Sequence, residues 1–242
     1  MSDITSQVAS STDLLMQELD IIAHNLANVS TTGFKRQCHA FAKSLVGQPL
    51  GEEVPAEVDL NSVLDFSQGS IVETARPLDL ALYGKGFFTI ETPQGPLYTR
   101  NGAFSTNANG QIVDMAGRIV AGQSGPMTIP AGASLSQLVV SGDGTVHAGN
   151  ATVGTFQIVD FGDDENKLIP AGLNCFLMPD ENVTPLATEK IVVKQGYQEA
   201  SNVSMVQELV DMIMVSRLYE ANMKFLTAQK ETGGSLLSVA MA

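Results

Sequence analysis

The N-terminal part of the chain carries apolar side chains at a spacing that predicts an amphipathic helix. The apolar positions alternate at steps of four and three residues and are Leu15, Leu19, Ile22, Leu26 and Val29. This alternation is a heptad seam, the pattern by which one helix packs along another. The seam stops at residues 30–33, where β-branched residues and a glycine favour the end of a helix. We therefore expect a helical segment over residues 1–42, with the helix itself ending near Gly33.

The C-terminal part of the chain repeats this arrangement. Its seam consists of Met205, Leu209, Met212, Tyr219, Met223 and Leu226. Further apolar residues at Val206, Val210 and Ile213 widen the apolar face, so we expect two partner surfaces on this helix rather than one. Ser204 followed three residues later by Gln207 is a capping-box pattern, which predicts that the helix begins at Ser204.

The C-terminal helix is expected to be unusually long. If it continues to about Leu237, its length is on the order of 50 Å at 1.5 Å per residue. A helix of that length cannot lie wholly on one compact domain of this size, so part of it should project. We assign residues 201–242 to a C-terminal helical segment.

Between the two seams, residues 64–200 hold most of the glycine and proline and short β-rich runs separated by turn signals. Three dipeptides have the composition of hairpin turns: Asn101-Gly102, Asn109-Gly110 and Asp143-Gly144. This part is predicted to be an antiparallel all-β domain. Residues 43–63, with glycine and proline among acidic residues, read as an extended linker. The predicted fold class is mainly β with α, a central β domain flanked by helices that pack together.

Charge and cysteine content exclude several classes of function. Thirteen basic and 26 acidic residues give a net charge of −13, which repels nucleic acid and anionic lipid head groups alike. The two cysteines, Cys38 and Cys175, lack metal or redox spacing and are read as packing residues. No apolar run approaches the length of a membrane span, and the N-terminus lacks the pattern of a conventional secretory signal.

The segment NLANVSTTGFKR, residues 25–36, resembles the signature of the flagellar rod and hook family. Residues 74–122 are similar to the β core of the same family, and residues 196–231 resemble its C-terminal helix. The three matches occur in the family's order and cover both ends and the middle. Within the family, the modest length and single β domain are most similar to the proximal-rod protein, with the distal-rod protein second. Ser11 and Thr12 stand where relatives commonly have glycine and an apolar residue.

The resemblance implies a structural subunit of the basal-body rod, located in the periplasmic part of the flagellum. Its implied partners are further copies of itself, neighbouring rod proteins and the flagellar type III export apparatus, through which the chain passes unfolded without a cleaved signal. Helical ends that are unstructured alone suit such a route, because they add little to the cost of unfolding.

In this interpretation the two seams pack against each other within a subunit, and neighbouring subunits cover the remaining apolar faces. The eleven seam residues listed above are therefore the predicted assembly interface. Asn25 and Asn28 flank the N-terminal seam and are expected to bond across helices, as polar residues near a seam fix register. Phe34 is expected to anchor the chain where it leaves the helix.

An enzyme is the first alternative class, and we expect no catalytic, cofactor or metal site. The only histidines, His24, His39 and His147, have no metal-ligand spacing, and His24 is expected on a helix surface. The acidic group at residues 160–165 lacks the spacing of a calcium loop and is read as a solvated loop. Residues 122–126 lack the second glycine of a serine elbow, and Gly233-Gly234 has no phosphate-loop context.

A secreted adhesin or surface-fibre subunit with coiled-coil ends is the alternative function. Such stalks usually carry reiterated heptads, whereas each seam occurs once here and the two ends differ in sequence. A third interpretation is that both seams are core helices of one compact globular protein. The free monomer distinguishes these alternatives: a compact protein has ordered termini, whereas an assembling subunit has termini that exchange quickly.

Overall fold

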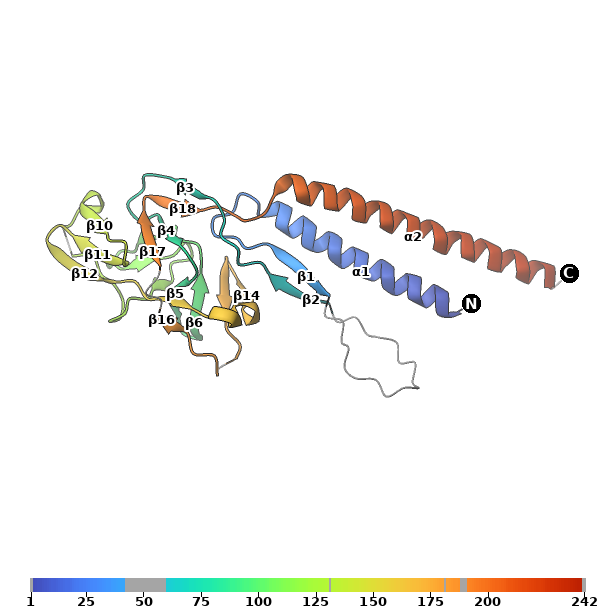
Figure 1. The fold of residues 1–242 in the computed structure, drawn as a ribbon, viewed down its shortest axis with the longest axis horizontal. Coiled ribbons are helices and arrows are strands. Elements are labelled where there is room, and N and C mark those ends of the chain that lie inside the picture. Colours follow the sequence, from blue (N-terminus) through green and yellow to red (C-terminus); the bar gives the residue numbers. More distant parts are fainter. Residues whose placement is uncertain (1, 42–59, 131, 181, 188–190, 241–242) are drawn as a thin grey trace. The chain divides into compact units, whose positions relative to one another are not determined.

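The computed structural model describes residues 2–41, 60–130, 132–180, 182–187 and 191–240 (Figure 1). These residues form two compact units. The helical unit comprises Met1–Asn28, Gln37–Ser62 and Val203–Ala242, and the β unit comprises Val29–Arg36 and Val63–Asn202. The predicted fold class is confirmed, since an antiparallel β part is combined with an N-terminal and a C-terminal helix that pack together.

The helical unit is built on two antiparallel helices, α1 (Ser2–Ala27) and α2 (Met205–Ala240), which lie side by side in Figure 1. Near one end, Asn25 Nδ2 donates to Glu208 Oε2 over 3.4 Å. Farther along, Asn222 Nδ2 donates to Ser11 Oγ, also over 3.4 Å. The same number of residues separates the two contacts along each helix, so the pair keeps one register over this stretch.

The second helix begins where its capping signal predicts. The carbonyl of Ser204 accepts from the Glu208 amide at 3.0 Å, and the first helical residue is Met205. Gln207 Nε2 donates to Asp211 Oδ1 one turn farther on, at 2.9 Å. With 36 residues, α2 is about 54 Å long at 1.5 Å per residue. The prediction of an unusually long C-terminal helix is confirmed.

The predicted end of the first helix near Gly33 is wrong, because α1 ends at Ala27. Asn28 closes the helix, its backbone and side-chain nitrogens both donating to the carbonyl of His24. The chain then enters the β unit, so Val29, expected on the helical seam, lies beyond the helix. Contacts made by residues 29–36 with distant strands override the local helical pattern.

A two-stranded sheet follows, in which β1 (Gln37–Phe41) pairs with β2 (Leu60–Leu64). The fully buried side chain of Asn25 bonds to the first residue of β1. Its Nδ2 donates to the carbonyl of Gln37 at 2.8 Å, and its Oδ1 accepts from the Gln37 amide at 2.9 Å. One side-chain amide thus satisfies both backbone groups of a strand residue. Residues 42–59, most of the predicted linker, lie outside the described residues. The bounds predicted for the four segments stay predictions.

The β unit consists of short, mostly antiparallel strands. They are β3 (Ile71–Glu73), β4 (Leu80–Tyr83), β5 (Phe87–Thr92), β6 (Gly95–Thr99), β7 (Ser105–Thr106), β8 (Ile112–Val113), β9 (Ile119–Val120), β10 (Leu138–Val140), β11 (Thr145–Ala148), β12 (Ala151–Thr155), β13 (Ile158–Asp160), β14 (Ile169–Gly172), β15 (Cys175–Leu177), β16 (Leu186–Ala187), β17 (Val192–Gln195) and β18 (Tyr197–Glu199). Short 3-10 helices occupy Leu135–Gln137 and Gly162–Lys167.

The largest sheet runs in the order β14-β15-β6-β5-β9-β8-β7, and both of its faces are covered around β5. Successive side chains of a strand point to opposite faces, so the adjacent, fully buried Phe87 and Phe88 enter different cores. Phe88 packs against Phe104 and Phe156, with ring centroids 5.1 and 5.7 Å away. Phe87 packs on Phe66 and other aromatic rings on the opposite side. The pair of phenylalanines therefore makes β5 the centre of the unit.

Two of the three predicted hairpin dipeptides are confirmed. Asn109-Gly110 joins the paired strands β7 and β8, and Asp143-Gly144 joins β10 and β11, with both glycines at positive φ. Asn101-Gly102 is not a hairpin turn. Gly102 lies against β4 instead, and a Cβ there would be 1.7 Å from the carbonyl oxygen of Leu80. The glycine serves close backbone approach, which the dipeptide alone does not reveal.

A buried cluster of three charged side chains links separate segments of the β unit. Glu199 receives Lys35 Nζ on Oε1 at 2.7 Å and Arg100 Nη1 on Oε2 at 3.5 Å, and none of these side chains is more than 2% exposed. The amide of Gly69 also donates to Glu199 Oε1, at 3.0 Å. Burial lowers the pKa of Lys35 and of Arg100, and the charge of Glu199 partly offsets that effect. One carboxylate thereby joins the segment after α1 to the ends of β6 and β18.

Gly33 brings the segment after α1 into this cluster. Its amide donates to the Glu199 carbonyl at 2.8 Å, and its φ of +69° confirms the expected left-handed conformation. A Cβ at this position would lie 2.5 Å from the backbone nitrogen of Asn101, so a side chain is excluded by space as well as by conformation. Phe34, next in the chain, is buried as expected of an anchor.

We predict that Gly33→Val lowers the free energy of unfolding by at least about 2 kcal/mol, because it adds strain and a backbone clash. Gly149→Val is the matched control, since Gly149 has a similar φ of +60° and open space around its Cβ position. It should lose only the cost of the backbone conformation, about 1–2 kcal/mol. Denaturant unfolding of both variants measures the difference. Equal losses would show that the contact with Asn101 has no energetic weight.

We further predict that Glu199→Gln destabilises the protein by about 3–5 kcal/mol, because it leaves two buried cations without a counter-charge. Lys35→Met should cost less, since Glu199 and Arg100 remain a pair. Glu73→Gln, which removes an exposed carboxylate on β3, should stay within about 0.5 kcal/mol of wild type. The three values come from denaturant titration. A larger loss for Lys35→Met than for Glu199→Gln would contradict the central role of the carboxylate.

Candidate functional site

The N-terminal seam faces the inside of the helix pair. Ile22 is 2% exposed, and Leu15, Leu19 and Leu26 are half-buried along the same stripe of α1. Burial of leucine and isoleucine side chains along two antiparallel helices stabilises the pair without any specific bond. The α1 residues of the predicted seam therefore share one packed face.

The predicted seam of α2 is covered only in part. Met212, Tyr219 and Leu226 are half-buried, whereas Met205, Leu209 and Met223 are exposed by 49%, 42% and 41%. The stripe turned toward α1 also includes the polar residues Glu208 and Asn222, which bond to Asn25 and Ser11. An apolar period does not identify these two positions, because both side chains are polar. The assignment of all these residues to an assembly interface stays a prediction.

The outer side of α2 is strongly apolar. Its exposed large hydrophobic residues are Met205, Val206, Leu209, Val210, Ile213, Met214, Leu218, Met223 and Phe225. We call this set the exposed apolar face of α2. It is densest in the first turns, while Arg217, Glu220 and Lys224 supply charge farther along the helix. A group of exposed large apolar side chains on one helix is typical of a protein–protein contact.

The sequence predicts that Asn25 and Asn28 bond across the helices. Asn25 bonds across the helices to Glu208, as expected, and both side chains are fully buried. Asn28 Nδ2 donates within its own helix, to the carbonyl of His24 at 2.9 Å. His24 itself is exposed on α1, in agreement with a helix-surface position.

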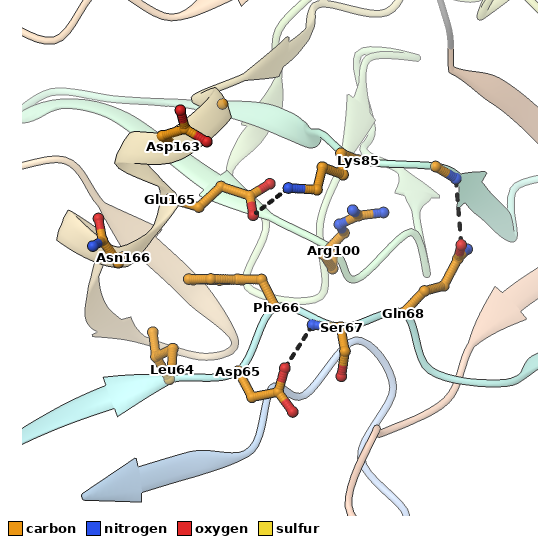
Figure 2. A pocket seen from close by; sticks show the side chains of 12 residues that line it. Leu64, Asp65, Phe66, Ser67, Gln68, Lys85, Arg100, Asp163, Glu165 and Asn166 are labelled. Carbon is orange, nitrogen blue, oxygen red and sulfur yellow. Dashed lines mark hydrogen bonds and ion pairs between the residues drawn. The ribbon is translucent and has the colours of Figure 1, made fainter. Parts of the chain in front are cut away.

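The β unit contains an open cleft of about 510 Å³, shown in Figure 2. It is lined by residues 64–68, Gly84, Lys85, Arg100, Gly162, Asp163, Glu165 and Asn166. Lys85 Nζ lies 3.7 Å from Glu165 Oε2, and the Lys85 side chain is mostly exposed. Burial raises the pKa of Glu165, and the nearby Lys85 charge opposes that shift. The lining combines acidic and basic groups with Leu64 and Phe66, and it includes no histidine, cysteine or tyrosine.

The other candidate chemistry of the sequence is occupied by structural contacts. Within the acidic group, Asp164 pairs with Lys167 at 2.9 Å, and Glu165 with Lys85. The described part of the chain contains no group of three or more histidine, cysteine or acidic residues arranged to hold a metal ion. Buried Cys175 accepts from Arg118 Nη2 over 3.0 Å, and burial raises the pKa of its thiol. Neither described helix has the length and apolar character to cross a membrane.

Family models match three parts of the chain. The model described as "Flagella basal body rod protein" matches residues 14–35, and that of the "Flagellar hook protein FlgE/F/G D1 domain" matches residues 81–148. The model of the "Flagellar basal body rod FlgEFG protein C-terminal" matches residues 194–239. The first and last matches contain most of the helix pair, and the middle one lies within the β unit.

Curated relatives are similar over nearly the whole chain. The flagellar basal-body rod protein FlgG of Agrobacterium fabrum is 33% identical, covering 92% of this chain and 94% of the relative. FlgF of Caulobacter vibrioides is 34% identical over 91% of both chains, and FlgF of Salmonella typhimurium is 31% identical over 88% of both. The resemblance found in the sequence is thereby confirmed: the chain belongs to the FlgE/F/G family of flagellar basal-body rod and hook proteins.

Proposed function

We propose that the chain is a structural subunit of the flagellar basal-body rod that polymerises through its terminal helices to support motility. Its family membership places it in the basal-body rod. The observation that carries the proposal beyond membership is the exposed apolar face of α2. Its partners are further copies of the chain and neighbouring rod proteins. Its role is mechanical, and it catalyses no reaction.

The energetics of α2 support folding that is completed by assembly. Full burial of one large apolar side chain contributes about 1.5–3 kcal/mol, and the exposed face carries several such residues. In a monomer that contribution is absent, while the entropy cost of ordering a long helix remains. Packing against α1 covers one side only, so contact with neighbouring subunits supplies the missing stabilisation.

The same energetics suit export of the unfolded chain through the flagellar type III apparatus. Helices that gain much of their stability from neighbours are easily unfolded before assembly. The β unit, by contrast, is stabilised by contacts within the subunit, namely its buried ion pairs and its two hydrophobic cores. The export apparatus is therefore proposed as a transient partner, and the rod as the place where the helices become fully ordered.

The direct test is an in-frame deletion of the gene in a motile host, followed by a motility assay and electron microscopy of purified basal bodies. We expect truncated or absent rods and a return of motility on complementation. The truncation point distinguishes a proximal position, our first prediction, from a distal one. Complete basal bodies in swimming cells would refute the rod function and favour the surface-fibre alternative.

We predict that Leu209→Asp abolishes incorporation into rods while the purified monomer stays folded, because Leu209 is 42% exposed on α2. A carboxylate placed in a contact between subunits is desolvated without a partner. Leu26→Asp should also abolish incorporation, but through loss of packing inside the helix pair. Circular dichroism of the monomer and quantification in purified basal bodies check both expectations.

The matched control is Thr227→Asp, which adds the same charge on an exposed position of α2 beside the charged residues of its outer half. It should incorporate like wild type. Normal incorporation of Leu209→Asp would remove the exposed apolar face from the assembly mechanism.

A further inference from the structure

The turn between β14 and β15 holds a leucine in an unfavourable conformation at the surface. Its two central residues, Leu173 and Asn174, have φ values of +50° and +56°, and Gly172 and Cys175 pair on either side. Two-residue turns with both residues at positive φ favour asparagine followed by glycine. A bulky side chain is rare in this conformation, because its Cβ crowds the following carbonyl.

Leu173 gains almost nothing from the rest of the subunit in return for this strain. Its side chain is 72% exposed, and Ile169, at the start of the same hairpin, is 46% exposed. Strained residues persist where the surrounding structure holds them, and they gather at functional contacts. A glycine or asparagine would close this turn at lower cost.

The turn is also held rigidly. Asn174 Nδ2 donates to the carbonyl of Thr32 at 3.0 Å, and the carbonyl of Asn174 accepts from Thr99 Oγ1 at 2.7 Å. Both partners belong to the β unit, close in sequence to the Lys35–Glu199–Arg100 cluster. The hairpin therefore presents Leu173 from a fixed position rather than from a loose loop.

On these grounds we infer that Leu173 is an intersubunit contact that packs against an adjacent copy of this chain. The inference rests on the proposed function, in which copies of the chain lie side by side in the rod. The charge of the chain permits a second copy as the occupant at this hairpin. Each copy has a net charge of −13, so contact between two copies is opposed least where no like charges meet. The hairpin is such a place, since residues 168–178 contain no charged side chain.

Contact through side chains fits the hairpin better than extension of the sheet. Pro170 lies within the edge strand β14, and the register shifts between Pro170 and Gly172. Proline and irregular register both hinder the addition of a further strand. The projecting Leu173 is thus the part of the hairpin that is suited to enter an apolar surface of the neighbour.

The proposal predicts opposite effects of Leu173→Asn on stability and on assembly. Asparagine tolerates positive φ, so the midpoint of thermal unfolding of the purified monomer should rise by about 2–4 °C. Incorporation into rods should fall about tenfold, as expected when one buried leucine is lost from a contact. Leu186→Asn is the matched control, because Leu186 is 62% exposed but lies in strand β16, and it should change neither quantity.

A benzophenone amino acid at position 173, with position 186 as the control site, identifies the neighbour by photo-crosslinking in cells. A crosslinked species of twice the chain mass, seen only for position 173, is the expected result. No crosslink, or a crosslink only to a different protein, would overturn the inference, as would undiminished incorporation of Leu173→Asn. Wild-type chain absent from purified basal bodies would instead refute the proposed function itself.

Discussion

The carboxylate of Glu199 is the constraint on which the β unit depends. It is the shared counter-charge for Lys35 and Arg100, which come from segments far apart in the sequence and are both buried. An unpaired buried charge costs several kcal/mol, so the three segments are stable only together. This explains why residues 29–36 belong to the β unit although they directly follow α1. The segment that resembles the family signature is therefore shared between the units, with Asn25 in one and Gly33 and Lys35 in the other.

The two units differ in how far their apolar and charged side chains are buried within the subunit. In the β unit, the aromatic cores on either side of β5 and the charge cluster are covered within the subunit. In the helical unit, the buried contact of Asn25 with Glu208 fixes the register of the pair, while the opposite side of α2 remains apolar and exposed. This division suits the proposed polymerisation, in which the β unit folds alone and contacts with neighbouring subunits complete the helical unit.

Backbone conformation and exposure distinguish residues that packing inside the subunit explains from residues that it does not explain. Gly33 and Gly102 occupy positions where a Cβ would collide with backbone, so their identity follows from packing inside the subunit. Leu173 has the opposite character, because its side chain is 72% exposed and the positive φ of its turn favours asparagine or glycine. The glycines are thus explained by the fold, whereas Leu173 is the residue that we propose to contact another molecule.

The sequence by itself determined the features that depend on local period and on turn chemistry. The two helices, the start of α2 directly after Ser204, the short strands, two hairpin turns and the positive φ of Gly33 all follow from nearby residues. Only the tertiary structure decided the end of α1, the close approach at Gly102 and the polar contacts of α2 with α1. It alone paired Lys35 with Glu199, 164 residues away. Periodicity records which side of an element is apolar, whereas these features depend on which distant backbone or charge lies opposite.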